Sequence, residues 1–99
     1  MYFIVNTSHA QPGKVSELIK ASHEFGALAK KLNGAEVTVL TPVSGKLSEV
    51  KTAWQAESLS QHEENLKTTQ AHPEWLALVQ KWAALVVPDT SHTDIYRRV

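Results

Sequence analysis

The final third of the chain carries more apolar helical surface than one face of a small sheet can cover. Residues 73–87 read PEWLALVQKWAALVV, and their apolar side chains extend well beyond a single helical stripe. Pro73 suits the first position of a helix and Glu74 its positive end, whereas Pro88 predicts its end. The alternating residues 93–99 predict a final strand. We therefore expect a small α+β domain that shares part of this surface with a second copy of itself.

Length and composition narrow the class of protein. A chain of 99 residues predicts a single domain, residues 1–99. Ten acidic and ten basic residues give zero formal charge without a large basic cluster, so no nucleic-acid partner is expected. The absence of cysteine excludes disulfides, a thiolate nucleophile and a cysteine-type zinc site.

Neither a membrane span nor a signal peptide is expected. The longest apolar run, Trp82 to Val87, is far shorter than the roughly 20 residues that a bilayer requires. The first residues lack a basic segment followed by an apolar run, which a signal peptide would show. We therefore expect a cytoplasmic protein with no membrane partner.

The spacing of apolar residues predicts elements in the order β-α-β-β-α-α-β. They are expected at residues 2–8, 14–33, 35–41, 47–56, 59–70, 73–87 and 93–99. Either Ser58 or Ser60 can cap the helix that ends near Gln70. This helix has few large apolar side chains, so we expect it to be peripheral and comparatively mobile. The order predicts an α+β, ferredoxin-like split β-α-β sandwich with a four-stranded antiparallel sheet and a divided second helix.

Two segments carry a resemblance to known proteins. Trp54 at the end of the third expected strand is followed by His62 on the next helix, and residues 72–88 precede the closing strand. In these features and in element order, the chain resembles the dimeric α+β barrel superfamily. Within it, the chain is similar to the NIPSNAP-like and antibiotic-biosynthesis-monooxygenase-like proteins.

The resemblance implies an architecture but no single activity. It implies a homodimer in which two sheets face each other as a barrel, with the helices outside and a cleft between sheet and helices in each subunit. Members include cofactor-independent monooxygenases, haem-degrading enzymes and many proteins without known activity, so membership alone does not define the function.

The resemblance also implies a candidate catalytic site formed by Asn6, Trp54 and His62. The Asn6 amide could hydrogen-bond a substrate oxygen, Trp54 could pack on an aromatic substrate, and His62 could accept a phenolic proton. In a purely structural interpretation, Asn6 ends a strand, Trp54 belongs to the core and His62 is a solvated helix residue. Haem degradation is not expected, because the helix after His62 lacks the second tryptophan of that pattern.

Four further residues are candidates for ligand binding. Ser22 and Gly26 are small residues on the buried face of the first helix, where they either permit close packing on the sheet or leave room for a ligand. His72 is either an extended loop residue before Pro73 or a ligand contact. Trp75 belongs to an apolar stripe that either packs in the core or dimer interface or forms part of a cofactor or ligand pocket.

No metal or cofactor site is expected. Two His-Glu pairs, at residues 23–24 and 62–63, begin the pattern of a zinc-protease helix, but Ala27 and Leu66 occupy the positions of its second histidine. The scattered glycines form no phosphate-binding loop.

Two functions remain compatible with these observations. The first is a homodimeric, NIPSNAP-like barrel that binds a small apolar or aromatic ligand in the sheet–helix cleft, with no assigned activity. The alternative is a cofactor-independent monooxygenase acting on an aromatic or polyketide-like substrate. The sequence leaves open whether the protein is an enzyme.

Overall fold

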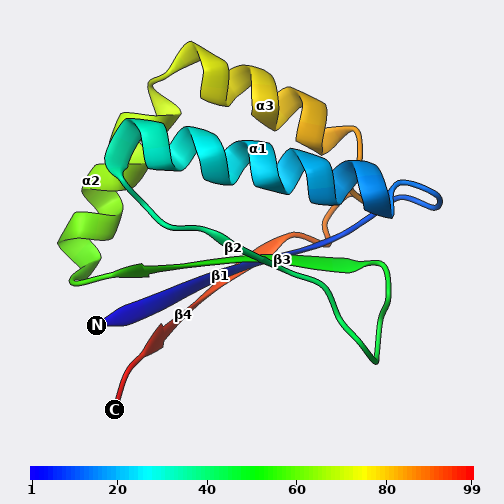
Figure 1. Cartoon of the computed structure of the whole chain (residues 1–99), viewed down its shortest axis with the longest axis horizontal. Helices are drawn as coiled ribbons and strands as arrows, with labels where there is room; N and C mark the ends of the chain where they lie inside the picture. The colour runs from blue at the N-terminus through cyan, green and yellow to red at the C-terminus, as the bar shows by residue number, and fades with distance from the viewer.

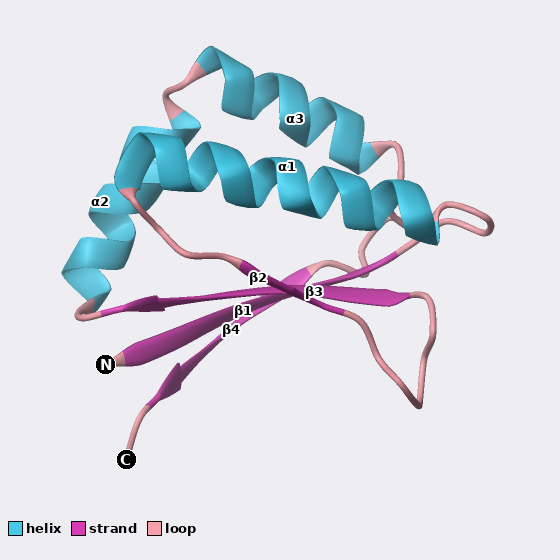
Figure 2. Ribbon diagram, in the orientation of Figure 1, coloured by secondary structure: helices cyan, strands magenta, loops and turns pink.

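Two layers, a twisted sheet and a layer of helices, make up the protein. The computed structural model describes residues 1–99 and measures 36 × 35 × 21 Å along its principal axes. All three helices lie on the same side of the sheet (Figure 1). The strands are β1 (Tyr2–His9), β2 (Thr38–Leu40), β3 (Glu49–Ala56) and β4 (His92–Arg97), and the helices are α1 (Val15–Asn33), α2 (Leu59–Gln70) and α3 (Pro73–Ala83). Figure 2 shows the same elements by type.

The sheet has the strand order β2-β3-β1-β4, and every neighbouring pair is antiparallel. This arrangement confirms the predicted α+β, ferredoxin-like topology. The expected hairpin-like pairing of β2 with β3 is also confirmed. In the register of the central strands, Asn6 lies opposite Thr52 on β3 and Thr93 on β4. Because side chains alternate along a strand, these three residues share one face of the sheet.

Local sequence signals account for two of the helix ends. Gly34 ends α1 in the left-handed conformation, with φ 77°, and its N–H donates to the Lys30 carbonyl at 2.9 Å. Ser58, not Ser60, caps α2, since its Oγ accepts from the Gln61 N–H at 3.0 Å.

The last helix is shorter than the apolar pattern predicts. It ends at Ala83 rather than at residue 87, and Leu85 and Val86 are buried beyond its end. Val86 forms an isolated antiparallel bridge with Ala10, and the Val87 N–H donates to the His9 carbonyl at 2.8 Å. Two β-branched residues before a proline disfavour helix, so this segment pairs with the chain after β1 instead.

The hydrophobic core is small and lies where α1 crosses the sheet. It combines side chains from α1 and β3 with those from the segments after β1 and α3: Ala10, Leu18, Ala21, Val50, Leu85 and Val86. Leu18 is completely buried. In contrast, α3 has no buried residue, and its Leu76 is 54% exposed. The broad apolar surface expected of the last helix is therefore only partly used within one chain.

The sheet face turned away from the helices, here called the open face, is not covered by any element (Figure 1). Strand alternation places on it the apolar side chains of Phe3, Val5, Leu40, Ala53 and Tyr96. The chain exposes 6406 Å², whereas a compact monomer of its mass would expose roughly 5,600 Å². None of the helices is long and apolar enough to pass through a bilayer.

Candidate functional site

A cavity of about 460 Å³ lies between the sheet and the helix layer. Strands β1, β3 and β4 form its floor, α1, α2 and α3 form its walls, and the segment that follows α1 closes one end. Three large side chains of α3 line the cavity: Trp75, Val79 and Trp82. The cavity corresponds to the sheet–helix cleft that the resemblance implied.

Aromatic rings form a large part of the cavity wall. All three tryptophans of the chain, Trp54, Trp75 and Trp82, line it, together with Phe25. Phe25 on α1 meets Trp75 on α3 edge to face, with ring centroids 4.8 Å apart and an interplanar angle of 64°. These rings offer flat apolar surfaces on which a planar ligand could pack.

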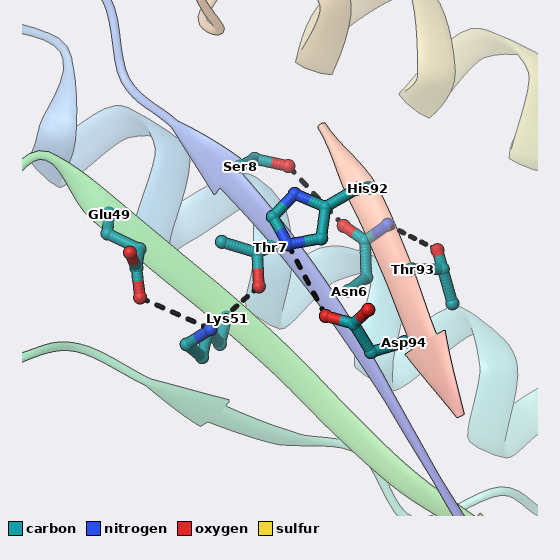
Figure 3. Close-up of polar contacts among 8 residues, drawn as sticks. All are labelled: Asn6, Thr7, Ser8, Glu49, Lys51, His92, Thr93 and Asp94. Carbon is teal, nitrogen blue, oxygen red and sulfur yellow. Dashed lines mark hydrogen bonds and ion pairs between the residues drawn. The ribbon is translucent and has the colours of Figure 1, made fainter. Parts of the chain in front are cut away.

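One end of the cavity is polar and is organised around Asn6. Its Nδ2 donates to Thr93 Oγ1 at 2.9 Å, and its Oδ1 accepts from Ser8 Oγ at 3.3 Å (Figure 3). Ser8 Oγ also lies 3.1 Å from Ser91 Oγ. These neighbours fix the orientation of the Asn6 amide and leave one N–H and one oxygen lone pair free. The amide can therefore donate to and accept from a ligand.

His62 is buried beside Trp54. The side chain is 8% exposed, so it is not the solvated helix residue of the purely structural interpretation. Its ring centroid is 6.1 Å from that of Trp54, with a tilt of 42°. His62 lines the cavity, and its imidazole makes no hydrogen bond within the protein. Because no fully buried side-chain nitrogen of the protein lacks a hydrogen bond, both imidazole nitrogens keep some exposed surface.

Helix α2 is mostly exposed, as expected of a peripheral helix, but the residues that it buries are not apolar. Its buried residues are the polar His62 and Thr69, whereas Leu59 is 44% exposed. Thr69 satisfies its hydroxyl by donating to the Asn65 carbonyl at 3.0 Å. A helix that turns polar side chains inward is explained by the cavity, which those side chains line.

The four candidate ligand contacts divide into two pairs. Ser22 and Trp75 line the large cavity, although the Ser22 hydroxyl already donates to the Leu18 carbonyl at 2.8 Å. Gly26 lies outside it, where a Cβ would approach the Val37 side chain to 3.3 Å. This position fits the close-packing alternative. His72 also lies outside the cavity and caps α3, its Nδ1 accepting from the Glu74 N–H at 3.3 Å.

Two residues of the polar end were missed by the sequence interpretation. Ser8 shares a strand face with Asn6, so strand alternation could have identified it. Thr93 lies 87 residues away and meets Asn6 only through the pairing of β1 with β4, which the sequence alone does not specify. No group of three or more histidine or acidic side chains is arranged to hold a metal ion.

Comparisons with known proteins agree with this architecture. The family model described as NIPSNAP matches residues 6–99. An uncharacterized NIPSNAP domain protein from Burkholderia xenovorans superimposes with a TM-score of 0.85 at 20% identity, covering 100% of this chain and 95% of the other. A NIPSNAP family protein of unknown function from Agrobacterium tumefaciens gives 0.84 at 21% identity, covering 99% and 87%.

A protein with a different family name also has a similar structure. A proposed antibiotic biosynthesis monooxygenase from Deinococcus radiodurans superimposes with a TM-score of 0.74 at 14% identity, covering 100% of this chain and 93% of the other. At this level of identity, the likeness concerns the fold alone. Among curated proteins, none matches the sequence.

Proposed function

The chain belongs to the NIPSNAP family, and on that premise we propose that it binds a small apolar or aromatic ligand in the sheet–helix cavity. The observation that carries the proposal is a cavity of about 460 Å³ with all three tryptophans in its wall. Ligand pockets typically measure about 300–1,000 Å³ and combine apolar walls with a few fixed polar groups. Here the oriented Asn6 amide supplies such a group.

The proposal includes a homodimer that forms through the open face. Support comes from the exposed area of 6406 Å², which exceeds that of a typical compact monomer by several hundred Å². Apolar side chains on the open face, including Val5 and Ala53, are well placed to pack against the same face of a second copy. The helix layer, and with it the cavity, stays on the outside of such a dimer.

Narrowing the cavity should weaken ligand binding. Ala29 lines the cavity and is buried, so Ala29→Leu should project an isobutyl group into it and weaken binding of 2-naphthol at least roughly tenfold. Quenching of tryptophan fluorescence measures the affinity directly, because every tryptophan lines the cavity.

The matched control is Ala27→Leu, the same change at an exposed position of the same helix and outside the large cavity. It should leave the affinity unchanged. If a panel of naphthols and anthraquinones causes no saturable quenching in the wild-type protein, the proposed function is wrong.

The second candidate function is a cofactor-independent monooxygenase, which the placement of His62 favours. The buried imidazole and the Asn6 amide line the same cavity, as an acid–base group and an oxygen-binding group would. His62 would remove a proton from an activated aromatic substrate, and the resulting anion would reduce dioxygen. A ring C–H of the phenol then becomes a carbonyl, giving a quinone: one oxygen atom enters the product, and the other leaves as water with the phenolic and the ring hydrogen.

Oxygen uptake with hydroxylated aromatics tests this second function. His62→Ala should lower the uptake rate about 10²–10⁴-fold, because a positioned base contributes that much. His23→Ala, at an exposed position of α1, serves as the matched control and should retain the full rate. Absence of enzyme-dependent uptake across the panel would rule out the oxygenase and leave ligand binding as the function.

A further inference from the structure

Charged residues are missing from the cavity wall. Lysine, arginine, aspartate and glutamate make up 20% of the chain, yet none of them is among the 20 residues that line the cavity. His62 is the only lining side chain with an ordinary acid–base function. The polar atoms that line the wall belong instead to hydroxyl and carboxamide groups, among them those of Asn6, Asn65 and Thr93.

Two charged residues of the cavity floor strand β3, Lys51 and Glu49, face away from the cavity and pair with each other. On β3, Thr52 faces the cavity. The preceding side chain, Lys51, lies on the open face and donates to Thr7 Oγ1 at 2.8 Å (Figure 3). Glu49 Oε1 lies 3.2 Å from the same Lys51 Nζ. These charged groups therefore have partners within the sheet and are separated from the cavity by it.

The helices show the same separation of charge from the cavity. Lys81 Nζ on α3 lies 3.0 Å from Glu24 Oε1 on α1, and neither residue lines the cavity. The ion pair joins two of the three helices that form the cavity wall, and its charges balance each other. A charged ligand would thus meet no lysine, arginine, aspartate or glutamate side chain at the wall.

We infer that the ligand of this cavity is electrically neutral: an aromatic phenol, quinone or amide rather than a carboxylate, phosphate ester or amine. The inference rests on the proposed function and specifies its ligand class. An ionised group moved from water into an apolar site without a partner is strongly disfavoured. Neutral hydroxyl, carbonyl and amide groups can instead exchange hydrogen bonds with the free N–H and lone pair of Asn6.

Naphthalene-2-carboxamide and naphthalene-2-carboxylate provide the test, because they share a shape and differ in charge. We expect the wild-type protein to bind the carboxamide at least roughly tenfold more tightly than the carboxylate at pH 7.5, measured by tryptophan quenching and calorimetry. Equal or tighter binding of the carboxylate would overturn the inference while leaving the proposed ligand binding intact. Failure of both compounds and of the wider aromatic panel would overturn the proposed function, and the inference with it.

A charge placed in the wall should change this preference. Asn65 lines the cavity, and Asn65→Lys should favour the carboxylate, reducing the ratio of the two affinities at least roughly tenfold. Ser60→Lys adds the same charge to an exposed position of the same helix and should keep the wild-type ratio. Equal shifts in both variants would show that overall charge, not the wall, sets the preference and would overturn the inference. If Asn65→Lys fails to fold, the comparison of the two naphthalenes in the wild-type protein still tests the inference.

Discussion

Replacing Ala53 with glutamate should dissociate the proposed homodimer. Ala53 lies in the middle of the open face, opposite Val5 on β1 and Thr38 on β2. In a two-fold symmetric dimer, both copies would bury a new carboxylate, and the lysine beside it on this face, Lys51, is already paired with Glu49. Each poorly paired buried charge costs about 3–5 kcal/mol. Two such charges offset most of the association free energy of a dimer with a micromolar dissociation constant, so the dimer should dissociate.

Sedimentation equilibrium measures the association constant and also detects a monomer that stays folded. Ala77→Glu makes the same substitution at an exposed position of α3 and should leave the dimer intact. A wild-type protein that is folded and monomeric at micromolar concentration would contradict the dimer. A dimer unaffected by Ala53→Glu would place the interface on another surface.

Truncating Leu18 should produce the largest loss of stability of any single leucine substitution in the protein. Leu18 is completely buried in the core cluster that joins α1 to β3 and to the segments around Ala10 and Val86. Leu18→Ala removes the buried side chain and leaves a cavity, which costs about 2–5 kcal/mol. Because the core of one chain is small, few neighbouring side chains are available to fill the space.

Urea denaturation at a fixed protein concentration measures the effect, since the stability of a dimer depends on concentration. Leu76→Ala is the matched control: the side chain is 54% exposed, and its loss should change stability by no more than about 0.5 kcal/mol. A Leu18→Ala variant as stable as the Leu76→Ala variant would contradict the placement of the core.

Local sequence signals predicted most of the fold. The order of elements and the end of α1 at Gly34 follow from periodicity and capping, and both are confirmed. The end of α3 was placed four residues too late, because the apolar run through residue 87 satisfies both a helix and the bridge that Val86 forms with Ala10. The β-branched Val86 and Val87 before Pro88 disfavour helix, and the bridge to Ala10 supplies the alternative pairing.

The cavity could be predicted only in part. The resemblance and strand alternation pointed to Asn6 and Trp54, which line the same face, but the partner Thr93 depends on a strand register that the sequence does not state. The buried residues of α2 could not be predicted for a different reason. Periodicity treats apolar side chains as buried, whereas here the buried residues are His62 and Thr69, which border a cavity.

The alternation of side chains along β1 also limits where insertions and deletions can be tolerated. Asn6 borders the cavity, and the adjacent Thr7 lies on the open face, so one strand serves two surfaces. Deleting one residue from β1 or β3 would exchange these surfaces, turning ligand-facing groups outward and hydrophobic groups inward. Insertions and deletions should therefore be tolerated better in the loop between Leu40 and Glu49, where Val43 is fully exposed, than within either strand.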